Sequence, residues 1–299
     1  MFWLILAWVL NRTQLFIAWR DYGHEWSGFG AIENIRRREA PAPMAYRPLM
    51  AILTWPLDVL CRQRGWNKVQ LSYEPIKIAM MAAALWSYHA LLSCWFEAGW
   101  AMAGTLLAGA LWTLTWLFDY WDLFPEWAAL SLAIYSARAG WPSWAVVLVG
   151  AIGLLGRETL LLYPLVYLLA GGWIETALLS LAAQASVWLC VTAWSRFPKR
   201  YCEFFQWRQN REHLLKWWRG ERLAFHSLEF TGLAWAVGSV AVLVAGLLRG
   251  DLPQALARTA WVAFLLLLGN WTVGLFREIR VSACAAIWVV PIILRWLIT

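Results

Sequence analysis

Apolar runs recur along this chain, and most are close to twenty residues long. The hydrocarbon core of a bilayer is about 30 Å thick and needs roughly 20 consecutive apolar residues in a helix. These runs therefore predict membrane-spanning helices, and the pattern as a whole predicts an all-α polytopic membrane bundle of about nine, and eight to ten, transmembrane helices. The predicted spans are 2–19 (interrupted by Asn11 and Arg12), 76–95, 101–118, 119–137, 144–169, 173–194, 228–248, 261–276 and 281–297.

Composition agrees with this pattern. Of the 299 residues, 62% are hydrophobic and 14% are charged, and the mean hydropathy is +0.54. The net charge of +7 and the 26 tryptophans do not indicate nucleic-acid binding, because the tryptophans lie in apolar runs and at their ends, as in an interfacial belt. The five cysteines are scattered singly, without the spacing of a metal site, and we expect no metal ligands among them.

Two polar stretches set the expected topology of a single integral membrane domain, 1–299. Residues 196–222 are basic and rich in aromatic side chains, which predicts a cytoplasmic interfacial segment. Counting back from it, residues 20–75 form one long outer loop with interfacial helices if 47–60 does not cross the membrane. If 47–60 crosses, residues 20–46 lie inside instead. We favour the outer loop, although it places six basic residues against the positive-inside rule: Arg36, Arg37, Arg38, Arg62, Arg64 and Lys68.

A charged pair interrupts the apolar run 146–169. Arg157 and Glu158 stand side by side near its middle, after three glycines and before Pro164. A charge at the centre of a membrane helix costs roughly 2.5–3.5 kcal/mol on insertion scales, so the pair needs polar partners. The glycines and the proline predict close backbone approach or a broken helix. Arg157 could bind a phosphate in bidentate fashion, or the pair could belong to a network that only fixes helix packing.

A second candidate is acidic. Asp119, Asp122 and Glu126 recur at positions that share one face of a helix. Like charges this close need a cation, water or an arginine between them, and Arg157 and Arg47 are the candidate arginines. The face could orient the hydroxyls of a sugar or hold a metal ion; the alternative is an exposed turn before the next span.

A third candidate lies just past the first span. Asp21, His24 and Glu25 are close enough in sequence to present two carboxylates and an imidazole to one site. A carboxylate there could act as a general base that removes a proton from an acceptor hydroxyl. The alternative is a solvated loop that caps the helix.

The layout of a first span, a long loop opening with acidic residues and a bundle with polar groups at one face resembles the GT-C class of glycosyltransferases. The quartets Tyr46-Arg47-Pro48-Leu49, Gly156-Arg157-Glu158-Thr159 and Arg277-Glu278-Ile279-Arg280 are also similar to a set found in compact bacterial membrane proteins. The resemblance implies a polyprenyl-phosphate-linked sugar as donor, catalysis at the outer face, and Asp21 or Glu25 as the acidic residue of the first outer loop. The chain departs from that class in having no adjacent acidic pair in the loop.

These observations predict a multi-pass protein of the inner (plasma) membrane, with membrane lipid as its surroundings. The first functional hypothesis is a glycosyltransferase in which Asp21 or Glu25 is the base. Asp119 and Asp122 position the acceptor or a metal, and Arg157 and Arg47 hold the lipid phosphate. His24, Glu126 and Glu158 are further substrate-binding candidates. The second is a transporter or flippase for a lipid-linked or anionic substrate. The third is a membrane scaffold without catalytic activity. The sequence identifies no cofactor.

Overall fold

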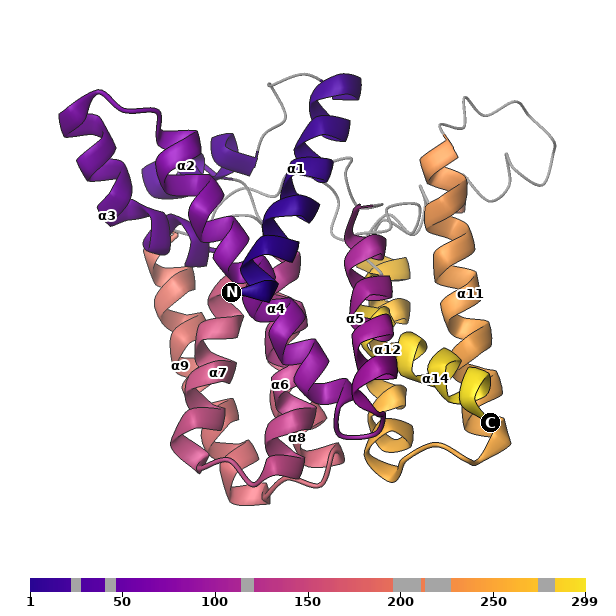
Figure 1. Cartoon of the computed structure of the whole chain (residues 1–299). Coiled ribbons are helices and arrows are strands. Elements are labelled where there is room, and N and C mark those ends of the chain that lie inside the picture. The colour runs from indigo at the N-terminus through magenta and orange to yellow at the C-terminus, as the bar shows by residue number, and fades with distance from the viewer. Residues whose placement is uncertain (23–27, 41–46, 114–120, 196–210, 213–226, 274–282) are drawn as a thin grey trace. The chain divides into compact units, whose positions relative to one another are not determined.

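The computed structural model describes residues 1–22, 28–40, 47–113, 121–195, 211–212, 227–273 and 283–299 (Figure 1). Within these ranges every regular element is a helix, so the prediction of an all-α chain is confirmed for them. The chain divides into two compact units, Met1–Tyr201 and Cys202–Thr299, which are described separately.

The first unit contains nine α-helices and two short helical turns among its described residues. In chain order these are α1 (Phe2–Tyr22), α2 (Gly28–Arg37), α3 (Leu49–Arg64), the π-helical turn η3 (Val69–Tyr73), α4 (Glu74–Leu92), α5 (Ala98–Thr113), α6 (Leu123–Ala139), α7 (Ser143–Gly156), the 3-10 turn η4 (Glu158–Leu162), α8 (Tyr163–Leu169) and α9 (Ile174–Trp194). Helix α1 runs without a break through Asn11 and Arg12, and the Arg12 guanidinium donates to Glu74 at 3.0 Å.

The stretch predicted as one span over 144–169 is instead a helical hairpin. Helix α7 ends at Gly156, and the chain then folds back along it through η4 and α8. The Tyr163 hydroxyl donates to the Val146 carbonyl at 3.0 Å, and a Cβ built on Gly153 would lie 3.0 Å from the Leu160 side chain. Residues late in α7 thus contact residues just after the turn, and residues early in α7 contact residues further along, so the two limbs of the hairpin are antiparallel. The expected broken helix is therefore confirmed, but the prediction of a continuous crossing is wrong.

Local sequence explains where the hairpin turns. Arg157 has an extended backbone, with φ −160° and ψ 138°, which ends the helical hydrogen bonding of α7. Pro164 stands in the first turn of α8, where its missing N–H costs nothing. At Gly150 a Cβ would lie 2.8 Å from the Tyr163 ring, so only glycine allows the two limbs to approach this closely.

Helices α6, α7 and α9 pack with their ends in register. Gly156 faces Pro125 at the start of α6, and the Ser143 hydroxyl is 2.7 Å from that of Thr176 at the start of α9. Hence α6 runs antiparallel to α7, and α9 runs parallel to it. The hairpin tip, the start of α6 and the end of α9 consequently lie at one end of this unit, here called the tip end.

Helices α2 and α3 also lie at the tip end (Figure 1). Trp194, at the end of α9, packs against the cluster built on Ile32, Ile35 and Met50, and the Arg38 guanidinium is 5.5 Å from its ring. The segments 20–75 and 196–222 were expected on opposite sides. The hairpin adds a return pass, so the described parts of the first segment and the end of α9 lie at the same end of this unit. The placement of the two segments relative to a membrane stays a prediction. Apart from residues 211–212, the segment 196–222 lies outside the described residues.

The second unit contains α11 (Ser227–Arg249), α12 (Gln254–Val273), the 3-10 turn η5 (Ala283–Ala285) and α14 (Ala286–Ile298). Its helices pack closely: a Cβ on Gly246 would lie 2.8 Å from Ile292, and the Trp288 indole donates to the Thr259 hydroxyl at 3.0 Å.

Length and apolarity together decide which helices in the described part of the chain could cross a bilayer. Only α9, with 21 residues, is long and apolar enough to span a bilayer by these two measures. Six further apolar stretches are shorter, including α7 and the combined limb of η4 and α8.

Candidate functional site

Five charged side chains from three segments meet at the tip end. Arg47 precedes α3, Asp122 and Glu126 lie at the start of α6, and Arg157 and Glu158 form the hairpin tip. All are buried except Glu158, whose side chain keeps 29% of its surface exposed. We call this group the tip network.

Arg47 links two carboxylates. Its Nε donates to Glu158 at 2.8 Å and one terminal nitrogen donates to the other oxygen of the same carboxylate at 2.5 Å. Its second terminal nitrogen donates to Asp122. This is the bidentate fork that a guanidinium also offers to phosphate.

Arg157 makes the second ion pair of the network. One terminal nitrogen donates to Glu126 at 2.5 Å, and the Thr159 hydroxyl donates to the other oxygen of that carboxylate. The Glu126 side chain is fully buried and that of Arg157 is 8% exposed. Removing either charge would leave the other uncompensated in an apolar interior.

The charges of the tip network nearly balance. Two arginines face three carboxylates, so the fully ionised group carries one net negative charge. Burial of the Arg47 guanidinium lowers its pKa, but the charges of Glu158 and Asp122 outweigh burial and raise that pKa above its ordinary value. Arg47 therefore stays protonated and available as a donor.

Packing holds the hairpin tip in place. A Cβ on Gly156 would lie 2.6 Å from Pro125 and 3.4 Å from Leu49, so the tip is wedged between α6 and α3. Behind it, the buried side-chain amide of Gln184 donates to the carbonyls of Gly150 and Leu160 at 3.1 and 2.8 Å. One side chain of α9 thus ties both limbs together.

Several predicted site residues converge here. The proposed arginine partners of the acidic face are confirmed, since Arg47 pairs with Asp122 and Arg157 with Glu126. Glu126 is buried, so the alternative of an exposed turn is wrong for it. Their roles toward a substrate remain predictions. His24, Glu25 and Asp119 lie outside the described residues. Asp21 is in the last turn of α1, and its side chain lies outside the described part.

The sequence did not predict the roles of two residues at this site. Thr159 belonged to a quartet singled out in the sequence, but its hydrogen bond to Glu126 requires the fold. Gln184 is the one strongly polar side chain inside the apolar run of α9, which is a usable signal for a buried hydrogen-bonding role.

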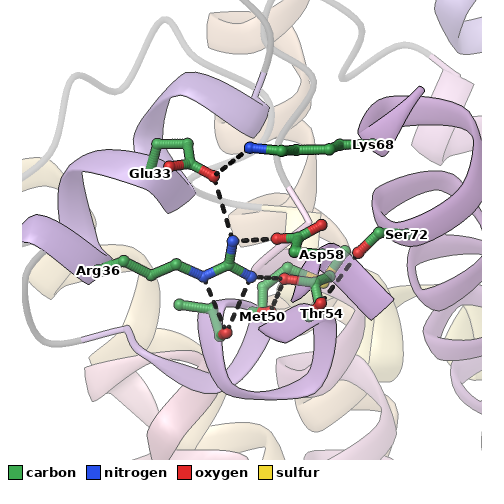
Figure 2. A network of polar contacts seen from close by, with 8 residues as sticks. Glu33, Arg36, Met50, Thr54, Asp58, Lys68 and Ser72 are labelled. Atoms are coloured by element: carbon green, nitrogen blue, oxygen red, sulfur yellow. Dashed lines mark hydrogen bonds and ion pairs between the residues drawn. The ribbon is translucent and has the colours of Figure 1, made fainter. Parts of the chain in front are cut away.

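A second polar network joins α2 to α3, and Figure 2 shows its residues. The Arg36 guanidinium donates to the Ala51 carbonyl at 3.2 and 3.1 Å, and also to the Thr54 hydroxyl and the Asp58 carboxylate. Glu33 pairs with Arg36 at 3.2 Å and lies 4.0 Å from Lys68. We call this group the α3 network.

No group of three or more His, Cys, Asp or Glu side chains suited to a metal ion occurs in the part of the chain that the structure describes. Comparison with known proteins finds no protein family, no curated protein and no solved structure that matches this chain.

Proposed function

We propose that this chain is a multi-pass integral protein of the inner (plasma) membrane. Support comes from the surface of α9, where Leu178 and Leu189 are 60% and 68% exposed while Gln184 is fully buried. A helix that buries its polar residues and exposes leucine fits an apolar solvent and would be costly in water. Because the two limbs of the hairpin are in register with α6 and α9, we count each limb as a short pass and propose about ten passes in all.

We further propose that the tip network receives the phosphate of a lipid-linked substrate. The observation that carries this proposal is the bidentate grip of Arg47 on Glu158, the most exposed carboxylate of the network. A phosphate offers the same pair of oxygens to the fork, so it can replace Glu158 without rearranging the guanidinium. Glu158 then acts as the internal anion that occupies the fork at rest.

The reaction class that we propose is glycosyl transfer from a polyprenyl-phosphate-linked sugar, as the resemblance to the GT-C class implies. Asp21 or Glu25 would act as the general base toward the acceptor hydroxyl. Placement at the outer face depended on the span count that the hairpin changes, and it is not retained.

A transporter or flippase is the second candidate, favoured by the α7–α8 hairpin. Broken helices at membrane depth occur where they line a protected polar site, and many transporters bind their substrates at such breaks. Both candidates use the same anion site and differ in whether a covalent product forms.

The test measures binding of a polyprenyl-phosphate sugar to the purified protein in liposomes. Arg47→Gln removes the fork and should weaken binding roughly 10- to 100-fold, since a hydrogen bond to a charged group contributes about 1.5–3 kcal/mol. Glu158→Gln should bind at least as tightly as the parent, because its amide competes less well for the guanidinium. Unchanged binding by a folded Arg47→Gln variant would contradict the phosphate site.

Product formation separates the candidates. For a transferase, Asp21→Asn or Glu25→Gln should abolish transfer of the sugar while lipid-phosphate binding persists. For a transporter, Arg157→Ala should abolish flipping in proteoliposomes, and no glycosylated product should form. A scaffold would show neither activity, and these substitutions would change only its stability.

A further inference from the structure

The middle of helix α3 buries two polar side chains and exposes several large apolar ones. Thr54 and Asp58 are 1% and 2% exposed, although both are polar. On the opposite side, five large apolar side chains are between 41% and 64% exposed: Ile52, Leu53, Trp55, Val59 and Leu60. This distribution is the reverse of that on a helix packed at a water-facing surface.

The α3 network fixes this orientation. Arg36 binds the Ala51 carbonyl and the Thr54 and Asp58 side chains from inside, and the Ser72 hydroxyl donates to the Thr54 carbonyl at 3.0 Å (Figure 2). Rotating α3 to bury its apolar face would break these hydrogen bonds. It would also separate the Asp58 carboxylate from the Arg36 guanidinium. The apolar face is therefore held outward.

The ends of the apolar face carry the residues of a membrane interface. Arg62 and Arg64 occupy the last turn of α3 and are exposed. Trp55 and Trp66 are 64% and 51% exposed, and amphipathic indole rings favour the headgroup level. With 16 residues α3 is about 24 Å long, short of the bilayer core.

Sidedness follows from the hairpin. Helix α3 lies at the tip end together with Trp194, where the chain leads into the basic segment 196–222. Four exposed arginines gather at this end of the unit, Arg37, Arg38, Arg62 and Arg64, and the positive-inside rule identifies such a side as cytoplasmic.

We infer that α3 lies in the plane of the cytoplasmic leaflet. Its face of Ile52, Trp55 and Val59 contacts the acyl chains, while Arg62 and Arg64 bind the phosphates of anionic lipids. This inference rests on the proposed membrane location and adds a lipid-binding surface to it. A second copy of the chain is a poorer occupant of this face, because a chain with a net charge of +7 offers Arg62 and Arg64 fewer anionic partners than an anionic leaflet does.

The first test measures insertion depth by spin labelling of the full-length protein in liposomes. Cys94, Cys190 and Cys202 are replaced by serine, the buried Cys61 and Cys284 are kept, and single labels are placed at Val59, Asn67 or Leu178. Relative to Asn67 on the polar loop, the Val59 label should collide several-fold more often with oxygen and less often with a water-soluble nickel complex.

Every other outcome for Val59 overturns the inference. Free access of nickel places α3 in water, and shielding from both reagents places it against another protein molecule. The Leu178 label on α9 separates the two proposals: if it collides with oxygen while Val59 is open to nickel, only the α3 inference fails. If both are open to nickel, the membrane location itself fails.

The second test needs no label at Val59. Phosphatidylglycerol added to phosphatidylcholine vesicles should raise the thermal unfolding temperature of the parent, and Arg62→Gln with Arg64→Gln should lose most of that shift. Arg258→Gln, at another exposed arginine, should keep it. Equal shifts in all three proteins would contradict the lipid contact.

A membrane-impermeant maleimide then tests sidedness on the Asn67→Cys variant. It should label inside-out vesicles and leave right-side-out vesicles unmodified. The opposite pattern would overturn the cytoplasmic assignment.

Discussion

The guanidinium of Arg157 donates to the carboxylate of Glu126 at 2.5 Å, across 31 positions of sequence and between the hairpin tip and α6. Both side chains are buried, and the Thr159 hydroxyl completes the coordination of the carboxylate. The pair holds the turn of the hairpin against the neighbouring helix.

Breaking this pair from one side should be more damaging than removing it whole. Arg157→Met leaves the Glu126 charge without its cation and should lower the free energy of unfolding by about 3–5 kcal/mol. The double variant Arg157→Met/Glu126→Met should recover most of that loss, because no buried charge remains. Chemical denaturation in mixed detergent micelles measures the free energy of unfolding of the single and the double variant.

Arg138→Gln is the matched control, since Arg138 is exposed in the last turn of the same helix α6. It should change stability by less than about 0.5 kcal/mol. If the double variant were as unstable as Arg157→Met alone, the loss of stability could not be attributed to the unpaired charge of Glu126.

Glycine at position 150 allows the limbs of the hairpin to approach. Gly150→Ala places a methyl group 2.7 Å from the Ser180 hydroxyl oxygen and 2.8 Å from the Tyr163 ring, so it should cost about 1–3 kcal/mol of stability. Gly238→Ala on α11 meets no atom within 4 Å and should stabilise by about 0.5–1 kcal/mol through helix propensity. Thermal unfolding of both variants gives the comparison, and equal effects would refute the close approach.

Gln184 should matter more for the hairpin than for α9 itself. Gln184→Leu removes two hydrogen bonds to the carbonyls of Gly150 and Leu160, and we expect a loss of about 1–3 kcal/mol. Hydrogen exchange should quicken in residues 157–163, and Ser186→Ala, at an exposed serine on α9, should leave it unchanged. Faster exchange throughout α9 instead would contradict a role confined to the hairpin.

A distance measurement distinguishes the hairpin from a continuous span. Helices α7 and α8 both pack on α6 and α9, so Trp144 and Leu168 should be separated by roughly 10–15 Å between helix axes, the diagonal of a small bundle whose neighbours are about 8–10 Å apart. A straight helix rising 1.5 Å per residue would separate them by about 36 Å. Double electron–electron resonance between spin labels at these two exposed positions measures the distance and distinguishes the two structures. A label pair at Ile174 and Leu189, both on the single helix α9, gives the reference distance along a continuous helix.

The candidate arginine pairs could be predicted because their reason is local and energetic. Charges embedded in an apolar run need partners, and few opposite charges are placed to supply them. The glycines and the proline around Arg157 likewise predicted a broken helix. The direction of the chain after the break could not be predicted, because an apolar run of this length is equally compatible with one crossing or two short limbs.

The amino-acid sequence by itself determined that this chain is helical, apolar and interrupted by buried charge, since these properties depend on composition and on neighbours along the chain. The tertiary structure decided which charges meet, and that α2, α3 and the end of α9 lie at the same end of the first unit. The reason is that a reversal at Arg157 is stabilised by contacts with α6 and α9, from residues such as Pro125 and Gln184 whose proximity no spacing in the sequence reveals.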